Sequence, residues 1–191
     1  MTEPNPPAGQ HSPGRAVPVL ILLLVLAAIV IVYLLMRSPG SSSSNQTHVM
    51  AGSPAAAGRY LILVGGCNDC HTPGFMEQGM KVPESQWLTG VPLGWRGPWG
   101  TTYASNLRLY AQTLTEEGWV MALRNRNARP PMPWPNLNEM SDRDLRAIYR
   151  YIRSLPLAGE KMPDWVPPDR EPTTPYLVMA PPTMPKDAPA P

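Results

Sequence analysis

The most marked feature of the hydropathy pattern is an uncharged run near the start of the chain. Residues 16–36, AVPVLILLLVLAAIVIVYLLM, contain no charged side chain. As an α-helix this run would be about 30 Å long, which is the thickness of the apolar core of a bilayer. It is longer than the apolar region of a typical cleaved signal peptide, and the LLMRSPG sequence at its end is a poor cleavage site. The pattern therefore predicts an uncleaved, single transmembrane helix.

Segments rich in Pro, Gly and Ser divide the rest of the chain. Residues 1–15 predict a short disordered tail, and residues 37–56 predict a flexible linker. Pro accounts for 26 of the 191 residues, and many of the prolines fall in residues 156–191. This last segment is predicted to be a Pro-rich tail, and two interpretations stay open: an extended arm, or a segment that packs on the domain or on a neighbouring subunit. The globular domain is therefore predicted over residues 57–155.

Three segments of the predicted domain carry a helical pattern. The first ends at the glycine pair before Cys67, the second follows Thr115, and the third follows Ser141. Thr115 and Ser141 are suitable N-caps, because a hydroxyl there accepts a hydrogen bond from the first turn. The apolar positions of the third segment recur at helical spacing; they are Leu145, Ile148, Tyr149 and Ile152. No segment alternates convincingly as a strand would, so an all-α domain is predicted.

The charge of the chain excludes one class of partner. The formal net charge is +2, which is too small to indicate binding to nucleic acid. Arg124, Arg126 and Arg129 nevertheless form a local basic group. They are interpreted either as a solvated helix end or as a rim that steers an acidic protein partner, and both interpretations stay open.

The two cysteines of the chain stand in the sequence Cys67-Asn-Asp-Cys70-His71. A structural zinc site needs four ligands, and the chain offers one Cys pair and three His. A thioredoxin-type disulfide needs a βαβ setting, which the pattern does not predict. Cys-x-x-Cys-His is the pattern of covalent c-type haem attachment, in which two thiols bond the haem vinyl groups and the adjacent His binds the iron. One covalent haem c is therefore predicted, held by Cys67 and Cys70, with His71 as an axial ligand.

A second axial ligand is sought among the methionines. Met132 lies between prolines in RPPMPWPNL, and prolines fix the backbone, so a thioether there loses little entropy on binding. It also follows His71 by enough chain to reach the other haem face. Met140 ranks second, because it precedes the N-cap Ser141, where an apolar residue is expected for packing. His48 ranks third.

Four pieces of residues 57–155 resemble the class I cytochromes c, in particular the bacterial dehydrogenase-associated subgroup. These are GRYLILVGGCNDCHTPG, GTTYASNL, EEGWVMALRNRNARPPMPW and MSDRDLRAIYRYIRSLP. The resemblance implies an all-α monohaem domain with Met132 as the second iron ligand, and Tyr151 or Tyr149 packed on the first helix near Gly58. The subgroup commonly continues Ile-Thr-Pro-Asp after the residue equivalent to Asn106, whereas this chain has Leu-Arg-Leu-Tyr.

The resemblance also implies a function and a place in the cell. In bacteria, haem is attached to such motifs outside the cytoplasmic membrane, so residues 1–15 would be cytoplasmic and the haem domain periplasmic. The expected protein is an electron carrier rather than an enzyme. It would pass single electrons between a respiratory donor and a terminal oxidase or similar acceptor.

Two alternatives to a free-standing carrier remain. The first is a fixed haem c subunit of a membrane-bound dehydrogenase or oxidase complex, with the anchor and the tail as docking elements. The second is a haem sensor or peroxidase-like enzyme with an open iron position. The second needs acid and base groups near the iron, and the histidines outside the motif are His11 and His48.

Overall fold

The computed structural model describes residues 16–36 and 47–180. The chain divides into two compact units, residues 1–45 and 46–191, which are treated separately. The predicted tail 1–15, residues 37–46 of the predicted linker and residues 181–191 lie outside the described residues.

The first unit contains one long helix, α1 (Ala16–Met36), as the uncharged run predicts. Its large apolar side chains between Ile21 and Tyr33 are exposed to solvent rather than packed into a core. Among the described residues, however, no helix meets the combined requirements of length and apolar character for a membrane span.

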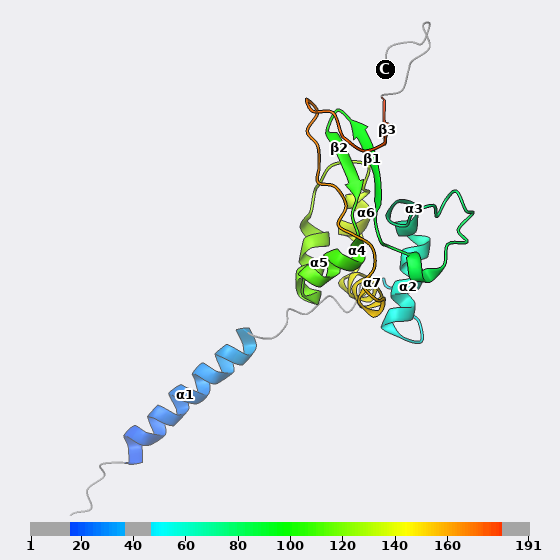
Figure 1. Ribbon diagram of the computed structural model, residues 1–191. Helices are drawn as coiled ribbons and strands as arrows, with labels where there is room; N and C mark the ends of the chain where they lie inside the picture. Colours follow the sequence, from blue (N-terminus) through cyan, green and yellow to red (C-terminus); the bar gives the residue numbers. More distant parts are fainter. Residues whose placement is uncertain (1–15, 37–46, 181–191) are drawn as a thin grey trace, which may run out of the picture. The chain divides into compact units, whose positions relative to one another are not determined.

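The second unit is mostly helical and includes a small sheet (Figure 1). Its helices are α2 (Pro54–Val64), α3 (Cys67–His71), α4 (Leu107–Tyr110), α5 (Glu116–Asn125), α6 (Trp134–Glu139) and α7 (Asp142–Ser154). Short 3₁₀ turns occur at Glu84–Gln86 and Ala111–Thr113. The predicted N-caps are confirmed: the Thr115 hydroxyl accepts a hydrogen bond from the Gly118 amide, and the Ser141 hydroxyl accepts one from the Asp144 amide.

The prediction of an all-α domain was wrong in one respect, because the described residues include a three-stranded sheet in the order β2-β1-β3. β1 (Val91–Gly97) and β2 (Gly100–Ala104) form an antiparallel hairpin, and β3 (Tyr176–Val178) lies parallel to β1. Pro92 and Gly94 interrupt the alternation of β1, and the register shifts between Val91 and Gly94. The sequence of β1 therefore resembles a loop, although its backbone pairs on both edges.

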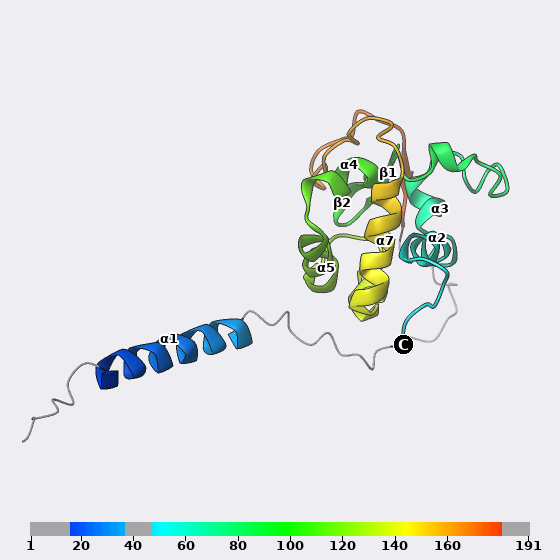
Figure 2. The same cartoon turned by 90° about the horizontal axis from the view of Figure 1, so that it is seen from below.

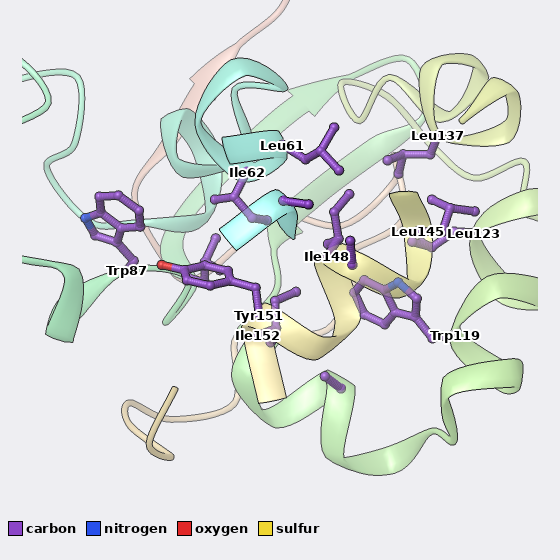
Figure 3. Close-up of a cluster of buried hydrophobic side chains, with 14 of the residues drawn as sticks. Leu61, Ile62, Trp87, Trp119, Leu123, Leu137, Leu145, Ile148, Tyr151 and Ile152 are labelled. Carbon is purple, nitrogen blue, oxygen red and sulfur yellow. The ribbon is translucent and has the colours of Figure 1, made fainter. Parts of the chain in front are cut away.

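The core lies where α2 and α5 pack against α7, with α6 packed against α5 (Figure 3). Figure 2 shows α7 with α2 on one side and α5 on the other. Leu145, Ile148 and Ile152 of α7 are almost fully buried, as their spacing predicts. The α2–α7 crossing is close: a Cβ built on Gly58 would lie 2.7 Å from Cβ of Tyr151 and would overlap the Ala147 carbonyl. The predicted contact near Gly58 is therefore made by Tyr151, whose hydroxyl donates to Oε1 of Glu84 at 2.7 Å.

Candidate functional site

The Cys-x-x-Cys-His motif forms its own short helix, α3, directly after α2. Gly66 links the two helices with a φ of 66°, a conformation that glycine adopts without steric cost. On the short helix that follows Gly66, His71 is buried, with 7% of its surface exposed. Cys67 and Cys70 are half-buried.

The two thiols lack the lowered pKa of a redox-active cysteine. Burial raises the pKa of Cys67 to about 11, and only a backbone hydrogen bond opposes it. Burial and the Asp69 carboxylate also raise the pKa of Cys70. A thioredoxin-type cysteine works through a lowered pKa, so this environment does not fit that alternative.

His71 is prepared to bind a metal through one particular nitrogen. Nδ1 lies 2.7 Å from the carbonyl oxygen of Ser105 and donates its proton to it. Burial lowers the pKa of His71, and the Ser105 hydrogen bond opposes this only in part, so the imidazole is neutral near pH 7. The free lone pair is then on Nε2. Histidines that bind a metal through one ring nitrogen commonly donate the proton of the other ring nitrogen to a backbone carbonyl in the same way.

Hydrogen bonds fix the segment that carries His71. Its carbonyl accepts from the Gly90 amide at 2.8 Å. The adjacent Thr72 hydroxyl donates to Oδ1 of Asn68 at 2.7 Å and accepts from the Leu88 amide at 2.8 Å. The His71 carbonyl and the adjacent Thr72 are thereby held against residues 88–90, and the hydrogen bond to Ser105 holds the ring.

Met132 lies in the loop between α5 and α6, half-buried and packed against the core cluster. The loop is held from the sheet, because the Thr102 hydroxyl of β2 donates to the Pro130 carbonyl at 2.7 Å. The Trp134 amide donates to the Met132 carbonyl at 2.9 Å and so closes the loop onto α6. The thioether is thus presented from a backbone that is tied on both sides.

Most of the other methionines in the described part of the chain are more exposed than Met132. Met76, Met80 and Met121 are more than 60% exposed. Met140 is the other half-buried methionine packed against the core among the described residues. It ends α6, and its carbonyl accepts from Nη2 of Arg124 at 2.7 Å, so its backbone completes the α6–α7 junction.

The basic group before Met132 is engaged within the domain. Arg124 forms an ion pair with Asp142 at 2.5 Å, which supports a structural role for this arginine. Arg126 lies over the Trp134 ring at 5.1 Å, and Arg129 lies 3.7 Å from the centroid of the Trp165 ring. Arg126 and Arg129 remain exposed, so both interpretations of their role stay open.

Buried hydrogen-bond donors without a partner test whether the site fits a haem, which is a flat, largely apolar group with two carboxylates. The described residues include four such donors: Asn68 Nδ2 and Nε1 of Trp99, Trp119 and Trp134. Asn68 stands between the two cysteines, and Trp134 follows Met132 by two positions. Buried donors normally have a partner, and a bound group with acceptor oxygens would supply one. Asn68 and Trp134, which neighbour the proposed thioether and iron-ligand residues, and the neutral His71 therefore fit the group.

Sequence reasoning missed two residues that support the site. Ser105 acts through its backbone carbonyl, which no side-chain pattern reveals. Arg108 is fully buried and donates to the carbonyls of Trp87, Pro156 and Glu84 at 2.7–2.8 Å. Its signal was the departure after Asn106: an arginine inside an otherwise apolar segment, which forms α4 here.

The family of the chain follows from a comparison with protein-family models. The cytochrome c model matches residues 55–156, more than half of the chain. The chain therefore belongs to the cytochrome c family; it binds haem c covalently and acts in haem-based electron transfer. Cys67 and His71 fit the attachment pattern of that family. No curated protein and no solved structure matches the chain.

Proposed function

We propose that this cytochrome c is a membrane-anchored monohaem carrier that passes single electrons on the periplasmic side of the membrane. Its donor is a respiratory component, and its acceptor is a terminal oxidase or a similar protein. The bound haem supplies a one-electron change between ferric and ferrous iron. The chain holds the iron ligands still during that change and keeps water away from them.

The observation that carries the proposal is the environment of His71. A buried, neutral imidazole donates Nδ1–H to the Ser105 carbonyl and leaves Nε2 for the iron. It directly follows the two cysteines on α3. A fixed ligand supports fast electron transfer, because the coordination does not have to rearrange when the charge of the iron changes.

The second ligand in this proposal is Met132, and Met140 supplies a matched control. Both methionines are half-buried and packed against the core. Met132→Ala should abolish the weak red charge-transfer band of the oxidised protein and let the reduced protein bind carbon monoxide. Met140→Ala should retain the band. The reverse pattern would assign the sixth position to Met140.

The anchor in this proposal is the uncharged helix α1. Its charge-free sequence and exposed apolar side chains support the assignment. The expected result is that the full chain stays in the membrane pellet after an alkaline carbonate wash and is released only by detergent. The haem domain of intact spheroplasts should be digested by added protease. Release by the carbonate wash would contradict anchoring, and protection in spheroplasts would contradict a periplasmic domain.

Part of the predicted tail packs within its own domain, and this supports a free-standing carrier over a fixed subunit. Up to residue 179 the segment forms hydrogen bonds with β1 and β2 of the same chain. It therefore does not behave as a free arm for docking to another subunit. Solubilisation in a mild detergent followed by size-exclusion chromatography separates the two cases: the carrier elutes alone, whereas a fixed subunit elutes with its complex.

A further inference from the structure

After α7 the chain folds back over the domain. We define residues 157–179 as the C-terminal strap. Figure 1 shows this orange segment running along the domain to the sheet, where β3 lies beside β1. Midway, Val166 pairs with Thr101 of β2 through amide–carbonyl hydrogen bonds of 2.7 and 3.0 Å. The strap therefore pairs with the sheet at two separate points, beside β1 and beside β2.

A single arginine of β1, Arg96, contacts four residues in the second half of the strap. Arg96 donates to the Pro168 carbonyl at 3.2 Å and to the Arg170 carbonyl at 2.9 Å. It also pairs with Glu171 at 3.3 Å and lies over the Tyr176 ring at 5.6 Å. Such a set of contacts holds an irregular, Pro-rich segment in one conformation without a core of its own.

The first half of the strap reaches the loop that carries Met132 and the neighbour of Ser105, whose carbonyl accepts the hydrogen bond from His71. The Trp165 ring lies 3.7 Å from the Arg129 guanidinium, three residues before Met132. The same indole donates Nε1–H to the Trp99 carbonyl at 2.9 Å. On the other side, Nδ2 of Asn106 donates to the Ala158 carbonyl at 2.8 Å, and Asn106 follows Ser105, the partner of His71.

The fit at Trp165 depends on a glycine in the hairpin. Gly100 has a φ of +94°, and a Cβ there would lie 2.7 Å from Nε1 of Trp165. Only a residue without a side chain allows the indole to approach the hairpin this closely. Trp165 is therefore held by the hairpin on its polar side while its ring is presented to Arg129.

From these contacts we propose that the C-terminal strap positions the loop that bears Met132, with the Trp165–Arg129 stack as its point of action. This inference rests on the proposed function, because it takes Met132 as the second iron ligand. The stack holds residues 129–132 in the ligating conformation, and the strap thereby sets how easily another ligand displaces the methionine. Trp165 is a positioning residue, since it acts through the loop.

The test is competition between the methionine and imidazole for the iron of the oxidised holoprotein, followed by loss of the charge-transfer band. A stack at a partly exposed site contributes a small free energy, so Trp165→Ala should raise the affinity for imidazole about two- to fivefold. Trp165→Phe keeps a ring over Arg129 and should restore most of the wild-type value. Leu177→Ala, at a half-exposed position of β3, is the control and should leave the affinity unchanged.

A second variant keeps the proposal testable if Trp165→Ala folds poorly. Arg129→Gln removes the other half of the stack at an exposed position and should raise the imidazole affinity by the same factor. The double variant should show no further increase, because both substitutions remove one interaction. Wild-type affinity in both single variants, or additive effects in the double variant, would overturn the proposal.

The result for Met132→Ala separates failure of this inference from failure of the proposed ligand. If Met132→Ala loses the band while the two stack variants bind imidazole as the wild type does, the ligand assignment stands and the strap proposal fails. If Met132→Ala keeps the band, the ligand assignment fails and the strap proposal falls with it.

Discussion

Replacement of Gly58 by Ala should weaken the crossing of α2 and α7, on which the domain is built. The added Cβ would lie 2.6 Å from the carbonyl carbon of Ala147 and 2.7 Å from Cβ of Tyr151. Carbon atoms pack at about 3.5–4.0 Å, so the helices would have to separate by about 1 Å. The clash is with backbone and Cβ atoms, and no side-chain rotation relieves it.

The expected loss follows from these distances. Overpacking of a tight core costs about 1–3 kcal/mol, whereas Ala in place of Gly in a helix gains about 1 kcal/mol. A clash with backbone belongs at the upper end of the first range, so the net loss should be about 2 kcal/mol. For a domain of this size that corresponds to a fall in Tm of about 6–10 °C. The assay is thermal unfolding of the holoprotein at pH 7, followed by circular dichroism.

Gly118→Ala is the matched control. This second helical glycine lies in the first turn of α5, where a Cβ would meet the Thr115 hydroxyl at 3.2 Å and a Leu114 methyl at 3.8 Å. The Thr115 side chain can shift by a few tenths of an ångström, so the change should stay within about 1 kcal/mol of zero. Equal stability of the two variants would refute the argument that the α2–α7 crossing requires a glycine.

Two further substitutions test the contacts around the core. The Glu116 carboxylate accepts hydrogen bonds from Arg150 and Arg146, and these lower its pKa despite partial desolvation. Because its pKa is lowered in the folded state, the ionised Glu116 stabilises the fold above the unfolded value of about 4.5, and this stabilisation is lost as the pH falls through the lower folded value. Glu116→Gln should therefore cost about 0.5–1 kcal/mol at pH 7, and the cost should shrink as the pH falls below about 4.5, as measured by urea unfolding; a pH-independent cost would contradict the ion pair. Thr102→Val removes the 2.7 Å hydrogen bond to the Pro130 carbonyl and should lower the free energy of unfolding by about 0.5–1.5 kcal/mol. Because this bond holds the Met132 loop, the oxidised holoprotein should also bind imidazole more tightly. Unchanged imidazole binding would show that the hairpin does not hold the loop.

The helices could be predicted because their signals are local. The hydroxyls of Thr115 and Ser141 begin α5 and α7 as their sequences indicate. The apolar spacing of α7 also predicted which of its residues are buried, except that Tyr151 rather than Tyr149 is the fully buried tyrosine. The haem motif is equally local, since five consecutive residues define it.

The sheet and the strap could not be predicted, because their stabilisation comes from distant parts of the chain. Gly94 and Pro92 disfavour a strand by themselves, yet β1 pairs with β2 and with a segment about 80 residues later. The Pro-rich strap has no apolar periodicity, and contacts with Arg96 fix it instead. The carbonyl of Ser105 that orients His71 leaves no trace in the sequence at all.

The optical spectrum of the purified protein, oxidised and reduced, with and without carbon monoxide, tests the central claim most directly. If Nε2 of His71 and the sulfur of Met132 fill both axial positions, the oxidised form shows a weak red charge-transfer band. The spectrum of the reduced form is then unchanged by carbon monoxide. A high-spin spectrum that shifts readily with carbon monoxide would mean an open iron position, and it would contradict the electron-carrier account.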